Sequence, residues 1–232
     1  MQYPYFILQN FVNDYTVNIF CDASMHNTDG CYGAIVFRNG QVLESIYRVC
    51  KDTTNNNAEI KAIRLSVYLA LKYKLAGVPV INIFSDSQIS VYGIRDRIYR
   101  YRVWGDQLMT ANNTPVANQS VFIEIVRLFV DYNLTNVYIY HQKGHVKINN
   151  IESLLNAKRV FKNSNDIKED VSLGFIEYIS MGNDMVDIRT GRKLHKFKGE
   201  KCIDPIYFTT QGFKEYARQY KQQIESKGER RK

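Results

Sequence analysis

The chain has 232 residues, and its 45% hydrophobic content excludes an intrinsically disordered protein. Its four cysteines (Cys21, Cys31, Cys50 and Cys202) lack metal-ligand spacing and are too sparse for a secreted disulfide scaffold. The sequence contains no apolar run of about 18 residues and no recognisable signal peptide, so we expect a soluble, cytoplasmic protein without a spanning helix.

The formal net charge of +8 is unevenly distributed. Residues 188–232 hold 13 Lys/Arg against 5 Asp/Glu, whereas residues 1–187 hold 18 of each. A basic segment after a neutral body indicates a polyanionic partner, first nucleic acid and second an anionic membrane. A solvated surface helix without a partner is the alternative. Within this segment, residues 211–226 are expected to form a terminal basic helix.

Three strands are predicted within residues 16–49. The Asn39-Gly40 pair between two β-rich runs indicates a hairpin, because both turn positions favour positive φ. Residues 56–75 then have apolar side chains at helical spacing and predict a helix.

The short apolar run 80–86 is typical of a strand buried on both faces, and another helix is expected from Ser87. Residues 98–117 are expected to be irregular. An amphipathic helix follows at 118–132 and a further strand at 136–142.

This order predicts an α/β fold, a five-stranded mixed sheet whose first three strands are antiparallel and whose faces carry helices. Residues 146–182 have no clear place in the scheme and are interpreted as an insertion with one or two helices. We expect one domain over residues 1–192 and a basic extension over 193–232.

Several acidic residues lie at the ends of predicted strands or in the first turns of predicted helices. Asp22 ends the first strand, Asp86 ends the fourth, and Glu59 lies in the first turn of a long helix, whose dipole is expected to keep it ionised. Asp187 lies in GNDMVDIRT, interpreted as the first turns of another helix. Four converging carboxylates would need cations between them, and hard ions such as Mg²⁺ or Mn²⁺ prefer oxygen ligands. Each acid alone is more often a cap or a surface residue, so the prediction depends on their combination.

Six ordered segments resemble the motifs of the type 1 ribonuclease H family: VNIFCDAS, CYGAIVF, TTNNNAEIKAI, INIFSDSQ, YHQKGH and GNDMVD. The resemblance covers residues 15–145 and 182–192. It implies a ribonuclease H-like fold and an endoribonuclease that cuts the RNA strand of RNA/DNA hybrids. The products would carry 5′-phosphate and 3′-hydroxyl ends.

The resemblance also implies a site with two divalent ions, Mg²⁺ first and Mn²⁺ second. Asp22 would bridge the ions, Glu59 and Asp86 would complete the site of one ion, and Asp187 would help to hold the other. His145, in KGH, matches the family's histidine that moves protons or helps the product to leave. Histidine as a residue type suits this task, because an unperturbed imidazole titrates near pH 6.5.

Polar side chains near the acids match the family's nucleic-acid contacts, amides for 2′-hydroxyls of RNA and a pocket for a phosphate of the DNA strand. Asn55 or Asn56 is also expected to cap the helix that carries Glu59. Trp104 fits either the family's DNA-strand channel or core packing. The predicted nucleic-acid-binding residues are Ser24, Thr54, Asn55, Asn56, Gln88 and Asn118.

The sequence departs from the family pattern at three places. Ala23 follows the first acid where the family usually has Gly, and the loop 98–114 lacks most of the lysines of a basic protrusion. His145 and Asp187 are separated by 41 residues, which leaves Asp184 as an alternative to Asp187. The inserted stretch 146–182 fits a lid over the site or a surface for a protein partner.

The sequence is also compatible with two other functions. One is a DNA-processing nuclease of the same superfamily, of the junction resolvase or transposase type. The other is a non-catalytic nucleic-acid-binding module with a vestigial site. The TTNN and DSQ segments favour an enzyme that acts on RNA/DNA hybrids over a DNA-processing nuclease, and the presence of all four acids argues against a vestigial site. We also expect a monomer without a membrane partner.

Overall fold

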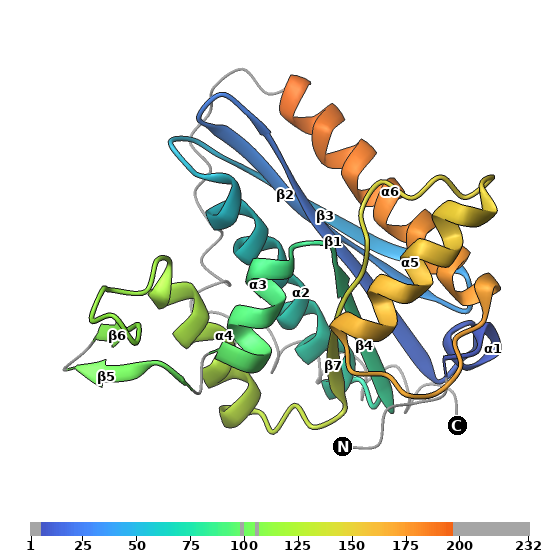
Figure 1. Cartoon of the computed structure of the whole chain (residues 1–232), viewed down its shortest axis with the longest axis horizontal. Coiled ribbons are helices and arrows are strands. Elements are labelled where there is room, and N and C mark those ends of the chain that lie inside the picture. The colour runs from blue at the N-terminus through green and yellow to red at the C-terminus, as the bar shows by residue number, and fades with distance from the viewer. Residues whose placement is uncertain (1–5, 98–99, 105–106, 197–232) are drawn as a thin grey trace, which may run out of the picture.

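The computed structural model describes residues 6–97, 100–104 and 107–196. A five-stranded mixed sheet in the order β3-β2-β1-β4-β7 forms its centre (Figure 1). The first three strands are antiparallel, whereas β4 pairs parallel with β1 and β7 pairs parallel with β4, which confirms the predicted fold class. The strands of this sheet are β1 (Thr16–His26), β2 (Asp29–Arg38), β3 (Gln41–Cys50), β4 (Val80–Ser85) and β7 (Val137–His141).

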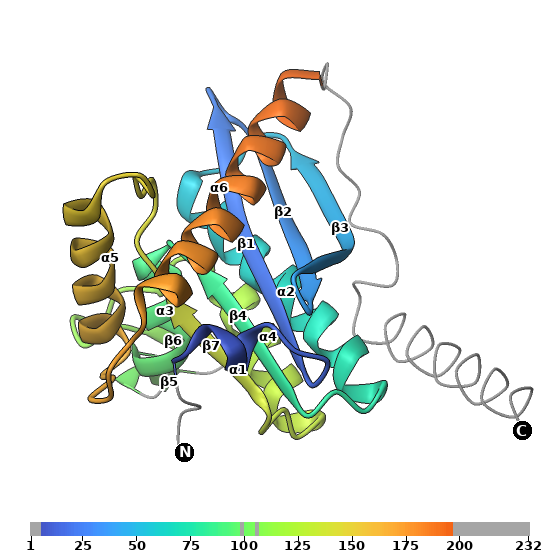
Figure 2. The same cartoon turned by 90° about the vertical axis from the view of Figure 1, so that its right-hand side faces the viewer.

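Helices cover both faces of the sheet. Figure 2 shows α6 crossing β1 and β2 on the near face, with α2 and α4 behind the sheet. A short π-helix, Gly93–Arg97, directly follows α3. The α-helices are α1 (Leu8–Phe11), α2 (Asn55–Leu75), α3 (Gln88–Tyr92), α4 (Gln119–Asp131), α5 (Ile151–Ser164) and α6 (Leu173–Lys196). None of these described helices is long and apolar enough to cross a membrane.

The alternation of side chains along β1 divides the core in two. Val17, Ile19 and Cys21 face α2 and α4, whereas Phe20 faces α6. Since both faces are covered, the strand reads as a nearly continuous apolar run. The hairpin predicted at Asn39-Gly40 is confirmed, with φ of 49° and 71° at the two turn residues.

The core under α6 is rich in aromatic rings and includes side chains of the inserted stretch. Phe161 of α5 is fully buried, and its ring lies 5.3 Å from the Phe6 ring, 5.8 Å from Tyr140 and 5.3 Å from Phe175. Residues 146–182 therefore contain α5 and the first part of α6, and α5 is packed into the core.

Phe161→Ala is expected to lower the free energy of unfolding by about 3–5 kcal/mol, because it leaves a cavity among rings that cannot close around it. Chemical denaturation monitored by circular dichroism measures the change. A loss below about 1 kcal/mol would contradict a core role for α5.

Three expectations need correction. GNDMVDIRT does not start a helix, since α6 begins at Leu173 and these residues lie in its interior. The stretch expected to be irregular contains a small hairpin, β5 (Arg102–Trp104) and β6 (Gln107–Met109). Core packing of Trp104 is wrong, because its side chain is 71% exposed. The basic helix expected at 211–226 lies outside the described residues.

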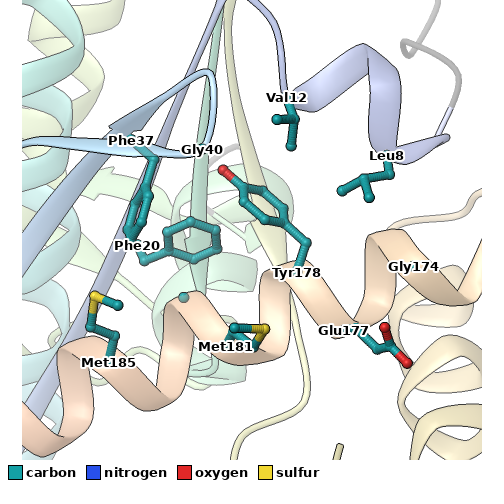
Figure 3. Close-up of a pocket in the computed structure, with 11 residues that line it drawn as sticks. Leu8, Val12, Phe20, Phe37, Gly40, Gly174, Glu177, Tyr178, Met181 and Met185 are labelled. Atoms are coloured by element: carbon teal, nitrogen blue, oxygen red, sulfur yellow. The ribbon is translucent and has the colours of Figure 1, made fainter.

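An apolar cavity of about 410 Å³ lies between α1, α6 and the turn that joins β2 to β3 (Figure 3). Phe20 and Phe37 form its wall on the sheet, and Tyr178, Met181 and Met185 of α6 close the opposite side. The cavity is separate from the predicted catalytic acids, since none of Asp22, Glu59, Asp86 and Asp187 lines it.

Candidate active site

The parallel register of β1 and β4 brings two acidic residues together. Phe20 lies opposite Phe84, and Asp22 and Asp86 each follow two residues later, at the same level of the sheet. Glu59 reaches them from α2, which packs against β1. One carboxylate oxygen from each of the three residues lies within 4.8 Å of the others.

The three carboxyl groups are largely removed from water. Asp22 is 5% exposed and Glu59 9% exposed, and Glu59 Oε2 has no hydrogen-bond partner among the described residues. Burial raises the pKa of Asp22, and the charges of Asp86 and Glu59 raise it further. Burial, Asp86 and Asp187 raise the pKa of Glu59 to about 8. The expectation that the helix dipole keeps Glu59 ionised is therefore wrong for the metal-free protein, because burial and neighbouring charge outweigh it.

The donor set fits a hard divalent cation. Three carboxylates that repel one another at this separation gain from a positive charge between them, and oxygen ligands suit Mg²⁺ and Mn²⁺. The orphaned Glu59 Oε2 is an unused oxygen ligand in the same cluster. Asp22, Glu59 and Asp86 are thus the residues that could hold the ion.

Asp187 lies at the rim of this cluster, on α6. Its Oδ1 accepts a hydrogen bond of 3.4 Å from Ser24 Oγ, and its Oδ2 lies 3.8 Å from His145 Nδ1. His145 itself is 83% exposed, so its imidazole is open to solvent and to a bound ligand. Asp184, one turn earlier, is half-buried, and its pKa is raised by burial first and by Asp187 second.

Sequence reasoning missed the polar groups that hold Asp86. Asn183 Nδ2 donates to Asp86 Oδ2 at 3.2 Å, and Gln142 Nε2 donates to Asn183 Oδ1 at 2.9 Å. Gly144 lies so close that a Cβ there would be 2.3 Å from Asp86 Oδ2. These three residues stand in the GNDMVD and YHQKGH segments, which were interpreted only through their acids and the histidine.

The predicted phosphate contacts lie where two helices begin. Thr54 is the N-cap of α2 and accepts a 3.2 Å hydrogen bond from the Asn57 N–H, so the expected cap at Asn55 or Asn56 is wrong. Asn55 and Asn56 are exposed. Asn57, which sequence reasoning missed, donates through Nδ2 to Asn118 Oδ1 at 2.7 Å and joins the starts of α2 and α4.

The remaining two predicted nucleic-acid contacts, Gln88 and Ser24, differ in whether the side chain is available to bind a ligand. Gln88 is exposed at the start of α3, two residues after Asp86. Ser24 Oγ lies 2.7 Å from Thr190 Oγ1 as well as near Asp187, so its hydroxyl is engaged inside the protein.

The raised carboxyl pKa values predict how stability depends on pH. Unfolded Asp and Glu titrate near pH 4, whereas Glu59 titrates at about 8 in the folded, metal-free chain. The folded state therefore holds more protons than the unfolded state between these values, so its stability falls as pH rises from about 4 through about 8. In EDTA, Tm is expected to be lower at pH 8.5 than at pH 6, and Mg²⁺ should restore it most at pH 8.5, where the ligands are deprotonated.

Differential scanning calorimetry at both pH values, with EDTA or with Mg²⁺, checks this prediction. Glu59→Gln is the control, because the amide cannot ionise and should make the pH dependence less steep, while the contribution of Asp22 remains. An equally steep decline in this variant would assign the effect to other groups.

The fold and the site together define an α/β protein of the ribonuclease H-like class with a carboxylate centre at the ends of β1 and β4. The family model described as RNase H matches residues 14–159, more than half of the chain. The chain therefore belongs to the RNase H family and is a ribonuclease H, a nuclease by class. The match ends before α6, so it does not extend to Asp187.

Solved structures are similar to the chain at low sequence identity. A foamy viral protease-reverse transcriptase, in a structure with dsDNA, is 13% identical with a TM-score of 0.50, and the match covers 80% of this chain and 96% of that chain. LC11-RNase H1, isolated from compost by a metagenomic approach, is 16% identical with a TM-score of 0.43, covering 66% of this chain and 96% of that one. No curated protein sequence matches the chain.

Proposed function

We propose that the protein is an endoribonuclease that hydrolyses the RNA strand of RNA/DNA hybrids with two divalent ions, Mg²⁺ or Mn²⁺. The observation that carries the proposal is the cluster of Asp22, Glu59 and Asp86, whose oxygens lie within 4.8 Å of one another. Asp187 is the fourth ligand in this proposal, supported by its place at the rim and by its effect on the pKa of Glu59.

When bound, two such ions supply an activated water for in-line attack and stabilise the leaving oxygen. The side chains have the tasks of holding and orienting. Asp22, whose carboxyl group lies close enough to Asp86 and Glu59 for their charges to raise its pKa, would hold the ions together with them. His145, exposed beside Asp187, is suited to carry a proton to or from the reacting phosphate or to help the product leave. Cleavage of the bond to the 3′ oxygen leaves 5′-phosphate and 3′-hydroxyl ends.

The substrate assignment is supported by family membership and by polar groups around the acids. Asn55, Asn56 and Gln88 are exposed amides with both donors and acceptors, as contact with 2′-hydroxyls in a shallow minor groove requires. Thr54 and Asn118, at the starts of α2 and α4, are suited to a phosphate of the DNA strand.

We also propose a domain organisation and a surface for a protein partner. We assign residues 1–192 to a monomeric catalytic domain and 193–232 to a basic extension that adds affinity for nucleic acid. The inserted stretch 146–182 offers a surface for a protein partner, since Ile151 and Leu155 are exposed one turn apart on α5.

Cleavage of four labelled duplexes with Mg²⁺, Mn²⁺ or EDTA tests the function. The duplexes are RNA/DNA, RNA/RNA, DNA/DNA and a four-way DNA junction, each also incubated with Asp86→Asn. We expect metal-dependent cutting of the RNA strand of the hybrid alone, lost in the variant. Cutting of the junction would move the function to DNA processing, and no cutting of any substrate would indicate a vestigial site.

A further inference from the structure

Two buried side-chain amides connect the edge of the sheet to the cluster of carboxylates. Gln142 directly follows β7, and its N–H donates to Ser85 O at 3.0 Å, which continues the ladder between β7 and β4. Asn183 lies on α6. Both side chains are 1% exposed, so water does not compete for their hydrogen bonds. They form two consecutive hydrogen bonds, one of 2.9 Å from Gln142 Nε2 to Asn183 Oδ1 and one of 3.2 Å from Asn183 Nδ2 to Asp86 Oδ2.

The carboxylate of Asp86 determines which way the two amides donate their hydrogen bonds. An ionised carboxylate only accepts hydrogen bonds, so Asn183 must turn its NH₂ group towards Asp86. Its carbonyl oxygen then faces Gln142, which must present its own NH₂ group. Gln142 Oε1 is left buried without a hydrogen-bond partner among the described residues, a destabilising arrangement. An apolar side chain at position 142 would avoid this unpaired oxygen, but it would also remove the hydrogen bond that Gln142 donates to Asn183.

The same hydrogen bonds also connect α6 to the end of β4. Asn183 and Asp187 are four residues apart on this helix and lie on the same face. A hydrogen bond that holds Asn183 against Asp86 therefore also acts, beside the packing of α6 on the sheet, on the distance between Asp187 and the other acids. A small shift of α6 would separate Asp187 from the cluster.

We propose that Gln142 and Asn183 form an amide relay that orients the Asp86 carboxylate for metal binding and fixes the register of α6 that places Asp187. The relay deepens the proposed function and rests on it. Asn183 and Gln142 are positioning residues, because they act on the reaction only through the acids. Hydrogen-bond partners of metal ligands commonly change metal affinity or activity by about 10- to 100-fold.

The test compares two relay variants with a buried amide elsewhere in the sheet. Asn183→Ala removes the bond to Asp86, and Gln142→Leu keeps the volume but removes the donor. Asn82→Leu is the matched control, since Asn82 is also fully buried, lies on β4 and bonds Asn18 rather than an acid. All three are measured by Mn²⁺ calorimetry without nucleic acid, by thermal unfolding in EDTA and by hybrid cleavage.

We expect Asn183→Ala to weaken Mn²⁺ binding by about 10- to 100-fold and to lower kcat with little change in KM. Gln142→Leu should show a smaller loss in the same direction. In the double variant the Gln142 substitution should add nothing, because residues of one relay are not additive. Asn82→Leu should lower Tm and leave the Mn²⁺ dissociation constant within about twofold, which separates positioning from stability.

Two results would overturn the relay. If the wild-type protein binds Mn²⁺ and cuts hybrid, but both relay variants bind Mn²⁺ as tightly as it does, the relay is wrong and the proposed function stands. If the losses in the two variants simply add, the amides act separately and the relay is again wrong. A wild-type protein that neither binds Mn²⁺ nor cuts hybrid would instead overturn the proposed function.

Discussion

Asp22→Asn is expected to reduce the rate of hybrid cleavage by about 10³-fold or more while raising the Tm of the metal-free protein at pH 8. Removal of one of the three clustered carboxylates costs several kcal/mol of charge stabilisation, and each 1.36 kcal/mol is a factor of ten in rate. Stability rises because the variant no longer buries a group whose pKa is raised by burial, Asp86 and Glu59. Since one pKa unit is worth 1.36 kcal/mol, a gain of about 1 kcal/mol or more is expected.

Steady-state cleavage of a labelled hybrid and thermal unfolding in EDTA measure the two effects. Asp131→Asn is the control, because Asp131 is exposed at the end of α4 and should affect neither quantity. An Asp22→Asn protein that is less stable than the wild type in EDTA would show that the carboxylate has a structural partner instead of a metal role.

Gly144→Ala is expected to lower kcat by about 100-fold with a small effect on folding. The added Cβ would lie 2.3 Å from Asp86 Oδ2, the oxygen that accepts the hydrogen bond of Asn183, so the carboxylate must leave its position in the cluster. A displacement of about 1 Å at a catalytic group is enough for a loss of this size. Folding should be little affected, because Gly144 follows β7 and lies outside its ladder.

Gly174→Ala is the matched control for this substitution. Gly174 lies on α6, and a Cβ there would meet only Leu8 Cδ2 at an ordinary 3.6 Å. This variant should keep full activity. Full activity in Gly144→Ala, with a crystal structure in which Asp86 has not moved, would contradict the assigned role of the close contact.

The three-carboxylate cluster could be predicted because local sequence determines most of it. Asp22 and Asp86 follow apolar runs that form adjacent parallel strands, and the carboxyl ends of such strands meet at one edge of a sheet. Glu59 follows a Thr/Asn run that starts a helix, and Thr54 indeed caps it. Short-range patterns and the topology rules for βαβ units are sufficient for these features.

The course of α6 could not be predicted from local pattern. The GNDMVDIRT segment was expected to start a helix, and glycine is unfavourable inside one. The structure places Gly182 within α6 because a Cβ there would be 2.6 Å from the Phe20 ring, so glycine allows the helix to approach the sheet. This requirement comes from packing between distant segments.

The amides around Asp86 were missed for a related reason. Gln142 and Asn183 are 41 residues apart, and Asn183 and Asp86 are 97 residues apart. Their hydrogen bonds exist only once α6 lies across the sheet. An amide within a motif gives no sign in sequence that its partner is a metal ligand.

The most direct measurement of the central claim uses one RNA/DNA hybrid labelled at the 5′ end of its RNA strand. The protein is incubated with it in Mg²⁺ or in EDTA, and the ends of the products are identified by mass spectrometry. The account predicts internal cuts of the RNA strand in Mg²⁺ only, with 5′-phosphate and 3′-hydroxyl ends. Cleavage that persists in EDTA, or products with 2′,3′-cyclic phosphate ends, would contradict a metal-dependent hydrolytic site at Asp22, Glu59 and Asp86.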